Sequence, residues 1–292
     1  MNLLISFSGG ETSAFMARWL IENKAQDYGE VVCLFANTGQ ENEETLRFVE
    51  QCDSAFGLNV VWLEAQVNNG RTGTSHRVVD YNTASRNGQP FEDVIKKYGI
   101  PNQAYPHCTR ELKLAPIRSY VKHLGWSSAD YKTAIGIRID EVDRVSPDAE
   151  KHNLIYPLVS DCPMTKPEIN QWWSQQPFRL NLKGYEGNCK WCWKKSLRKH
   201  LTLLTEHPDW YDFPDRIEQE HGLAGHNVDG TPRVFFRNNQ SVKDLRIMVK
   251  TIDFEPASDD SRDYVYQQRL DLGAGCTESC EIDFSQLAEK DK

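Results

Sequence analysis

Short apolar runs alternate with helical patterns along the first half of the chain, and this alternation constrains the fold more than any other feature. The predicted strands are residues 3–7, 30–35, 59–63 and 131–137. The predicted helices are residues 13–23, 43–56, 92–98 and 110–124. Strands that alternate with helices form a mainly parallel, twisted sheet with helices on both faces, so we expect a Rossmann-like α/β fold. The polar stretch 66–89 is predicted to be a long loop or a lid.

The first predicted strand ends in a Ser8-Gly9-Gly10 turn, and a helical pattern follows at once. Glycine has no Cβ, so the backbone there can approach a ligand closely. The first N–H groups of a helix have no internal partner and carry the positive end of the helix dipole. We therefore predict a phosphate-binding loop, to which Thr12 and Ser13 add hydroxyl donors. The alternative is an ordinary strand-to-helix turn that one of these hydroxyls caps.

Asn37 and Thr38 follow the second predicted strand, and Gly39 permits a sharp turn after them. In parallel sheets, ligands bind at the carboxyl ends of the strands, where the Ser-Gly-Gly turn also lies. We expect these three residues to contact the ribose or the base of a nucleotide. The alternative is a plain turn.

Gly136 and Arg138 follow the last predicted strand and are expected at the same edge of the sheet. The planar guanidinium of Arg138 suits a phosphate group. Asp140 or Glu141, just beyond it, can bind Mg²⁺ or a ribose hydroxyl. The alternative is a solvated charged loop.

The composition excludes some classes of protein. The net charge of −8 argues against broad electrostatic coating of nucleic acid, although it leaves a local basic groove open. No apolar run approaches the length that spans a bilayer, and the N-terminus has no basic segment typical of a signal peptide. We therefore expect a cytoplasmic protein without a membrane partner.

Cys108 stands at the start of a predicted helix, with Arg110 and Lys113 in the next turn. A helix N-terminus and nearby cations lower the pKa of a thiol and favour the thiolate. A thiolate can act as a nucleophile or as a metal ligand. Cys108, Arg110, Lys113 and Arg138 are therefore the candidate catalytic residues.

Four more cysteines stand out among the eight in the chain. Cys189 and Cys192 form a Cys-x-x-Cys pair, and Cys276 and Cys280 lie near the end of the chain. In a reducing compartment these residues do not indicate a disulfide framework. With Cys108 they can supply four thiolates to an iron–sulfur cluster or to a structural zinc ion. The alternative is a set of free thiols.

Six segments, in matching order, resemble the phosphoadenylylsulfate (PAPS) reductase-like branch of the PP-loop adenine-nucleotide α-hydrolase superfamily. They are residues 8–13, 35–41, 81–91, 108–113, 136–144 and 187–194. Many superfamily members have Lys-Asp after the glycines, where this chain has Glu11-Thr12. The resemblance implies an enzyme that binds ATP or a related adenine nucleotide with its α-phosphate near the Ser-Gly-Gly loop.

The resemblance also implies a [4Fe-4S] cluster, because adenylylsulfate reductases of the family hold one with a Cys-Cys pair and a distal Cys-x-x-Cys. In this chain the Cys-Cys pair reads His107-Cys108, so the fourth ligand must be another residue. Cys276, Cys280 and His107 are the candidates. Zinc accepts either kind of ligand and is the alternative metal.

Reductases of the family carry a nucleophilic cysteine in a C-terminal Glu-Cys-Gly-Leu-His segment, whereas residues 276–280 here read Cys-Thr-Glu-Ser-Cys. We therefore expect cleavage of ATP to AMP and pyrophosphate, in sulfur transfer or nucleic-acid modification. The expected partner is then a nucleic acid, a sulfur donor or a redox protein. True sulfonucleotide reduction is one alternative. A non-catalytic accessory protein that binds nucleotide or nucleic acid is the other.

The resemblance extends over roughly the first two thirds of the chain. We expect residues 1–185 to form the nucleotide-binding α/β domain. Residues 186–292 are expected to form a helical, metal-binding extension that packs on this domain.

Overall fold

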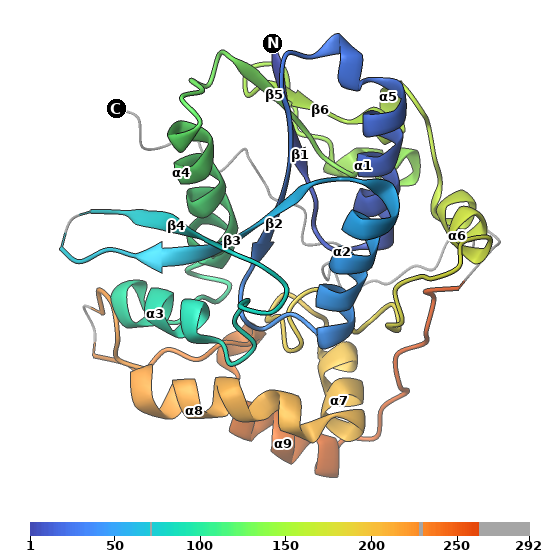
Figure 1. Ribbon diagram of the computed structural model, residues 1–292. Coiled ribbons are helices and arrows are strands. Elements are labelled where there is room, and N and C mark those ends of the chain that lie inside the picture. The colour runs from blue at the N-terminus through green and yellow to red at the C-terminus, as the bar shows by residue number, and fades with distance from the viewer. Residues whose placement is uncertain (71, 228–229, 263–292) are drawn as a thin grey trace.

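The computed structural model describes residues 1–70, 72–227 and 230–262, and its centre is a six-stranded sheet in the order β4-β3-β2-β1-β5-β6 (Figure 1). The strands are β1 (Asn2–Ser6), β2 (Val31–Asn37), β3 (Val60–Val67), β4 (Thr74–Val79), β5 (Tyr131–Ala134) and β6 (Leu154–Ile155). All neighbouring pairs are parallel except β3 and β4. The expected mainly parallel α/β fold is confirmed.

Helices of different lengths connect the strands. The α-helices are α1 (Glu11–Asn23), α2 (Glu43–Phe56), α3 (Gln89–Tyr98), α4 (Ala115–His123), α5 (Pro157–Ser160), α6 (Lys166–Ser174), α7 (Leu197–Glu206), α8 (Asp212–His221) and α9 (Val242–Thr251). The shorter elements are the 3₁₀ turns η1 (Ala25–Asp27), η3 (Ile139–Arg144), η4 (Pro208–Tyr211) and η5 (Arg237–Asn239), and the π-helical turn η2 (Arg110–Leu114) that leads into α4.

The central strand β1 faces a layer of helices on each side, because successive side chains of a strand point to opposite faces. Ile5 packs in a core with residues of α1, α2 and α6, including the fully buried Trp173. Leu4 packs on the other face, in a core with Ile117 of α4. Helices therefore cover both faces of the sheet (Figure 1).

Helices α7, α8 and α9 lie together beyond the carboxyl end of β1 (Figure 1). A third core joins them to the α/β part of the molecule through α3 and β3. Its centre is Trp191, whose ring lies 5.2 Å from that of Phe91 and 4.7 Å from that of Phe235. Among the described residues, no helix is both long and apolar enough to cross a membrane.

The prediction of a single long loop over residues 66–89 is wrong. The segment contains β4, which pairs antiparallel with β3 from Trp62↔Val79 to Val67↔Thr74. This edge strand is partly exposed along its length and rich in polar residues, so its composition resembles that of a loop. The last residue of the segment, Gln89, already belongs to α3.

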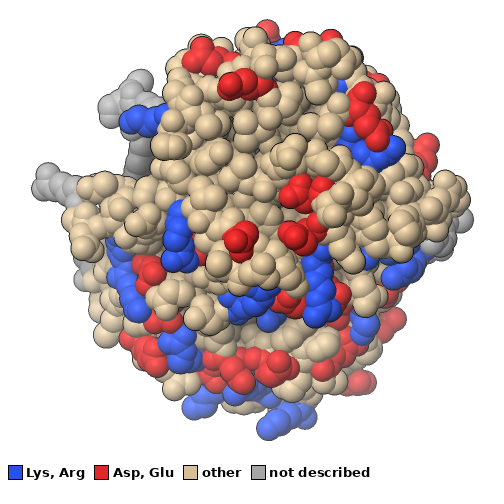
Figure 2. Space-filling model, viewed as in Figure 1, with Lys and Arg blue, Asp and Glu red and all other residues tan. Residues whose placement is uncertain are grey.

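Basic and acidic side chains are intermixed on the face shown in Figure 2, over the region of α3 and α8. Basic and acidic residues of these helices also form ion pairs, such as Arg216 of α8 with Glu92 of α3 at 2.7 Å. This face therefore has no broad positive surface of the kind that binds nucleic acid non-specifically.

Candidate functional site

The Ser-Gly-Gly turn connects β1 to α1 at the carboxyl edge of the sheet, and its two glycines differ in conformation. Gly9 has φ +83°, and a Cβ there would lie 2.7 Å from Thr45 Cγ2 and 3.1 Å from the ring of Phe35. Gly10 is extended, with φ −100°, and a Cβ there would approach nothing closer than Ser8 Oγ at 3.7 Å. Gly9 is therefore required by the fold, whereas Gly10 leaves open space in front of the turn.

Hydroxyl groups stabilise the turn from within. The Ser13 hydroxyl donates to the Gly10 carbonyl at 3.0 Å and accepts from the Ser8 N–H at 3.2 Å. The two serine hydroxyl oxygens are 2.8 Å apart, and Ser13 is fully buried. Ser13 thus holds the turn in shape, while the neighbouring hydroxyls of Ser8 and Thr12 line the space in front of it.

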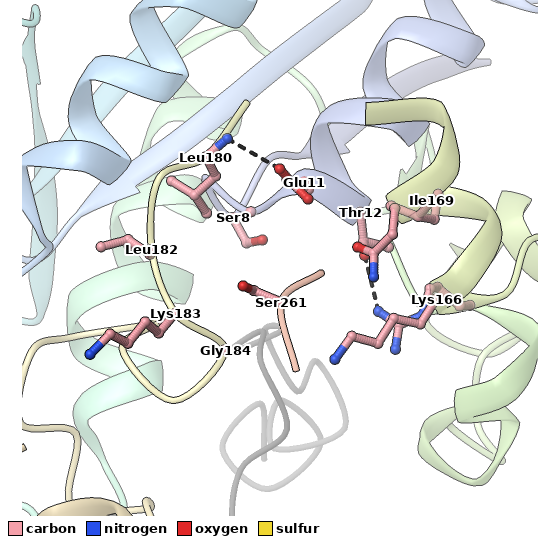
Figure 3. Close-up of a pocket in the computed structure, with 14 residues that line it drawn as sticks. Ser8, Glu11, Thr12, Lys166, Ile169, Leu180, Leu182, Lys183, Gly184 and Ser261 are labelled. Atoms are coloured by element: carbon pink, nitrogen blue, oxygen red, sulfur yellow. Dashed lines mark hydrogen bonds between the residues drawn. The ribbon is translucent and has the colours of Figure 1, made fainter. Parts of the chain in front are cut away.

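That space is a pocket, which we call the loop pocket (Figure 3). It contains about 650 Å³ of space, part of it continuous with solvent. Its lining residues are Ser8, Gly10, Glu11, Thr12, Arg138, Lys166, Ile169, Asn170, Leu180, Leu182, Lys183, Gly184, Gly187 and Ser261. Four residues predicted from the sequence for the nucleotide site therefore meet here: Ser8, Gly10, Thr12 and Arg138.

Arg138 reaches the turn from the segment that follows β5. Its Nη1 donates to Thr12 Oγ1 at 3.0 Å, and its Nε donates to Asp140 Oδ1 at 3.0 Å. Gly136 does not line the pocket, but a Cβ there would lie 3.1 Å from Ser13 Cα, so this glycine lets the two segments approach. Glu141 pairs with Arg138 at 3.4 Å. Both carboxylates that the sequence suggested for Mg²⁺ are therefore paired with this arginine.

Glu11, which stands where many PP-loop proteins have lysine, forms part of the wall of the loop pocket. Its carboxylate accepts from Arg179 Nε at 2.9 Å and Nη2 at 2.8 Å, and from the Leu180 N–H at 3.1 Å. Burial raises the pKa of Glu11, and the Arg179 guanidinium opposes that shift. Glu11 therefore fixes residues 179–180 against the start of α1.

Lys166 and Lys183 line the loop pocket but were not singled out from the sequence. Lys166 is the first residue of α6, and Lys183 lies on the irregular segment between α6 and α7. Figure 3 shows them on opposite sides of the pocket. Neither lysine belongs to a recognised motif. For Lys166, the sequence does contain a Thr165-x-x-Glu168 capping box, which marks the start of a helix at that residue.

Asn37, Thr38 and Gly39 do not line the loop pocket in the structure. Asn37 is fully buried and donates to Glu64 Oε1 at 2.7 Å and to the Ser85 carbonyl at 2.9 Å. Gly39 has φ +78° and packs against residues 88–90. Whether any of the three contacts a nucleotide stays a prediction.

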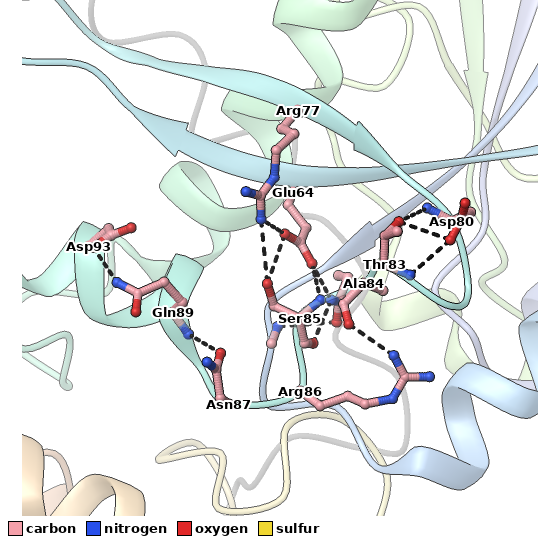
Figure 4. Close-up of polar contacts among 12 residues, drawn as sticks. Glu64, Arg77, Asp80, Thr83, Ala84, Ser85, Arg86, Asn87, Gln89 and Asp93 are labelled. Carbon is pink, nitrogen blue, oxygen red and sulfur yellow. Dashed lines mark hydrogen bonds and ion pairs between the residues drawn. The ribbon is translucent and has the colours of Figure 1, made fainter.

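The buried Glu64 organises the segment that follows β4 (Figure 4). Its carboxylate accepts from the Ser85 N–H at 2.6 Å and from the Ser85 hydroxyl at 3.0 Å, and it pairs with Arg77. Together with Asn37 at the end of β2, these contacts attach Ser85 to β2 and β3. The segment that resembles the family at residues 81–91 therefore has a structural role at the sheet edge.

Cys108, Cys189 and Cys192 line a second cavity, which we call the cysteine pocket. Trp193 Nε1 donates to Cys108 Sγ at 3.5 Å, and Cys189 Sγ lies 3.4 Å from Thr38 Oγ1. Burial is the main cause that raises the pKa of the Cys189 thiol well above its usual value. The structure thus brings together the three cysteines that the sequence grouped, whereas Cys276 and Cys280 lie outside the described residues.

Lys113 also lines the cysteine pocket, and its Nζ lies 4.0 Å from Glu41 Oε1. Arg110 lies one turn earlier, with 40% of its side chain exposed, and pairs with Glu111 at 2.7 Å. Of the four candidate catalytic residues, Arg138 alone lines the loop pocket, while Cys108 and Lys113 line the cysteine pocket. Their catalytic roles stay predictions.

The three described cysteines do not form a compact group of ligands for one metal ion. Among the described residues, the groups of three candidate ligands whose donor atoms all lie within 4.8 Å of one another are Glu92, Glu220 and His221, and Glu186, Glu206 and His207. The three cysteines are not such a group. A tetrahedral zinc ion with bonds of about 2.3 Å needs sulfur atoms about 3.8 Å apart, whereas a cluster of several irons spans more space.

Consecutive residues of the chain line the two pockets. Gly187 lines the loop pocket, and Asn188 and Cys189, the next two residues, line the cysteine pocket. Asn188 has φ +65°, a left-handed conformation that asparagine tolerates better than most residues. The backbone therefore turns between the two pockets within three residues.

Comparisons with known proteins place this geometry in context. A family model described as the phosphoadenosine phosphosulfate reductase domain matches residues 2–146, which include the Ser-Gly-Gly turn and Arg138. The chain is 34% identical to the uncharacterized nin region protein ORF290 of Escherichia phage lambda, over 97% of this chain and 96% of that protein. It is 31% and 26% identical to two uncharacterized proteins of Methanocaldococcus jannaschii, over 40% and 41% of this chain but 22% and 20% of theirs.

Proposed function

Because the chain belongs to the phosphoadenosine phosphosulfate reductase family of the PP-loop superfamily, we propose that it is an enzyme that acts at the α-phosphate of an adenine nucleotide. The proposed reaction is cleavage of ATP to AMP and pyrophosphate. The observation that carries the proposal is the meeting of Ser8, Gly10, Thr12 and Arg138 in one pocket at the carboxyl edge of a parallel sheet.

The residues of the loop pocket match the charge of a polyphosphate. The first N–H groups of α1 and the hydroxyls of Ser8 and Thr12 can donate to phosphate oxygens. Arg138 lies at the same turn, and Lys166 and Lys183 add positive charge at the sides. In the reaction, a water oxygen bonds to the α-phosphorus while the bond to the bridging oxygen breaks, so that AMP and pyrophosphate form. Where an oxygen of a nucleic acid attacks instead, pyrophosphate leaves first, and AMP leaves when sulfur displaces it from the adenylylated product. Fixed positive charges stabilise the negative charge that develops on the phosphate oxygens.

The cysteine pocket supports an iron–sulfur cluster as part of the proposal. Cys108, Cys189 and Cys192 are the three ligands that the described residues can supply, with Cys276 or Cys280 as the fourth. His107 is a less suitable fourth ligand, because its Nε2 lies 3.1 Å from the Gly99 carbonyl and it does not line the cysteine pocket. When bound, such a cluster would supply electron-transfer or sulfur chemistry beside the nucleotide. Zinc is the alternative metal.

Reduction of a sulfonucleotide is the second candidate, and the adjoining loop and cysteine pockets favour it. A nucleotide whose sulfate points toward Gly187 and Cys189 would lie near both. The first proposal predicts a nucleic acid that accepts the adenylyl group, or a protein that donates sulfur to the activated product. The second predicts a redox partner.

Product analysis tests the proposal and separates the candidates. Anaerobically purified protein is incubated with Mg²⁺ and ATP labelled at the α-phosphate, and separately with a sulfonucleotide and a thiol reductant. We expect labelled AMP with an equal amount of pyrophosphate from ATP. Sulfite release without ATP cleavage would favour the reductase. Nucleotide binding without either product would favour an accessory protein, and absence of binding would reject the site.

Arg138→Ala is the variant that links binding to the pocket. Loss of a charge-assisted contact to phosphate costs about 1.5–3 kcal/mol, so the dissociation constant for ATP should rise roughly tenfold to a hundredfold. The exposed Arg118, on α4, is a matched control, since Arg118→Ala removes the same charge at a residue that does not line the loop pocket. Calorimetric titration measures both; equal affinities in the two variants would place the nucleotide elsewhere.

A further inference from the structure

Residues 257–262 form a strap across the opening of the loop pocket. Figure 3 shows Ser261, which lines the pocket, between the side chains of Lys183 and Lys166. The strap contains no helix or strand, and it follows α9 in the sequence. Its position therefore depends on individual hydrogen bonds and ion pairs to neighbouring elements.

One end of the strap is fixed to the C-terminal helices. Ala257 is 8% exposed, packs in the core around Trp191, and donates its N–H to Thr202 Oγ1 of α7 at 2.8 Å. Farther along, Asp259 Oδ1 accepts from the Gly184 N–H at 3.0 Å. Arg179 Nη2 donates to the Ser261 carbonyl at 3.3 Å. The strap is thus attached beside the pocket and then crosses it.

Asp260 forms the contact that bears on ligand binding. Its Oδ2 lies 3.0 Å from Nζ of Lys166, and the side chains are 39% and 19% exposed, respectively. The carboxylate therefore holds a lysine of the pocket wall from the solvent side. A carboxylate oxygen and a phosphate oxygen make the same kind of charge-assisted contact to an ammonium group.

The other cations around the pocket pair with acids on more firmly held elements. Arg179 pairs with Glu11 of α1, and Lys183 pairs with Glu206 of α7. Asp260 differs because it lies on the strap and can turn into water without leaving a buried charge. The Lys166–Asp260 pair is therefore one that an incoming phosphate can replace.

We propose that Asp260 occupies the place of a ligand phosphate at Lys166, so that Lys166 is a further nucleotide-binding residue and the acidic strap competes with the nucleotide. This inference rests on the proposed function, because it assumes that the loop pocket takes a nucleotide. It adds that binding must displace the strap.

Affinity measurements on four variants test the competition. The probe is α,β-methylene-ATP, which cannot be cleaved between its α- and β-phosphates, titrated calorimetrically into the full chain. Asp260→Asn should tighten binding about threefold to fivefold, the upper range for a partly exposed ion pair. Asp253→Asn is the matched control, because Asp253 is exposed on the same stretch and has no ion pair among the described residues. It should bind like the parent protein.

A double-mutant cycle shows whether the effect passes through Lys166. Lys166→Ala should weaken binding, and adding Asp260→Asn to it should change nothing further. If Asp260→Asn raises the affinity equally in the parent and Lys166→Ala backgrounds, the proposed competition at Lys166 is rejected. It is also rejected if Asp260→Asn does not raise the affinity of the parent protein. Neither result contradicts nucleotide binding itself. Failure of the parent chain to bind the probe rejects the proposed function instead. Circular dichroism of each variant confirms that it is folded before its affinity is compared.

Discussion

At the scale of single residues, the two glycines of the turn serve different purposes. Gly9 adopts a positive φ in a position where a Cβ would clash with Thr45 and Phe35. Gly10 has an ordinary extended backbone, and it borders the loop pocket. The first glycine lets the turn form, and the second lets a ligand approach it.

Gly10→Val should therefore leave the protein folded and abolish nucleotide binding. Valine is compatible with φ −100°, although it is a poorer N-cap than glycine, so the free energy of unfolding should fall by at most about 1 kcal/mol. Its branched side chain would fill the space in front of the turn. Gly9→Ala is the contrasting variant, expected to lose about 1–3 kcal/mol of stability through backbone strain and overpacking. Urea denaturation and calorimetry measure the two effects; unchanged affinity in folded Gly10→Val would contradict the assignment.

Sequence patterns predict well which side chains lie near the carboxyl edge of the sheet. They predict less well which residue each of these side chains contacts. Ser8 lies in the turn after β1, Thr12 near the start of α1 and Arg138 in the segment after β5, and all three line the loop pocket. Asn37 is the last residue of β2, yet its side chain turns inward because the buried Glu64 carboxylate needs a donor. That partner comes from another strand, so no local pattern reveals it.

At the scale of elements, strong periodicity predicted the helices well, and weak periodicity hid the edge strand. The helix expected over residues 43–56 has those bounds in α2, where an apolar face packs on the sheet. Strand β4 has no fully buried residue, and polar residues occupy positions 74–77, so its sequence lacks the alternation that marks a half-buried strand. It forms because β3 offers it an edge with which to pair.

Glu218 of α8 connects three elements and should make stability depend on pH. Its carboxylate accepts from the Phe235 N–H at 2.9 Å and from the Val242 N–H, at the start of α9, at 2.9 Å. Burial raises the pKa of Glu218 to about 7 from an ordinary value of 4.5. Between these values the folded state binds more protons than the unfolded state, so stability falls as pH rises.

We therefore expect a contribution of Glu218 that is most favourable below pH 4.5 and is lost as pH rises through about 7, amounting to up to about 3 kcal/mol. Glu218→Gln cannot ionise and should remove this slope, although it loses one of the two acceptors. Urea denaturation of both proteins at intervals from pH 5 to 8 gives the difference between their free energies of unfolding at each pH. The contributions of other titrating groups cancel in this difference. An identical pH dependence in the two proteins would show that Glu218 is not responsible.

At the scale of the whole molecule, chain segments far apart in sequence meet at one side of the sheet. The sequence predicted the α/β fold, because alternating strands and helices have few other solutions. It did not predict Lys166, Lys183 or Ser261 in the loop pocket. These residues come from segments between and after the motifs, where tertiary packing alone decides the position.

The meeting of Cys108 with Cys189 and Cys192 has a consequence for the rest of the chain. Cys108 lies in the α/β part, and the Cys-x-x-Cys pair lies just before α7. A cluster with three ligands here and a fourth at Cys276 or Cys280 would join both parts to the end of the chain. Because metal binding to such ligands is coupled to folding, the cluster should stabilise the whole molecule.

Anaerobically purified protein should therefore be brown, with broad absorbance near about 400 nm and about four irons and four sulfides per chain. Cys189→Ala/Cys192→Ala should lose the metal and unfold at a lower temperature, because the cysteine pocket loses two thiolates and the link between the two parts. Cys162→Ala is the control, since Cys162 packs against the core on the α1 side and does not line that pocket. Elemental analysis and thermal melts of the three proteins decide the matter. One zinc per chain would keep the shared site and reject the cluster, whereas equal metal content in all three proteins would reject the site.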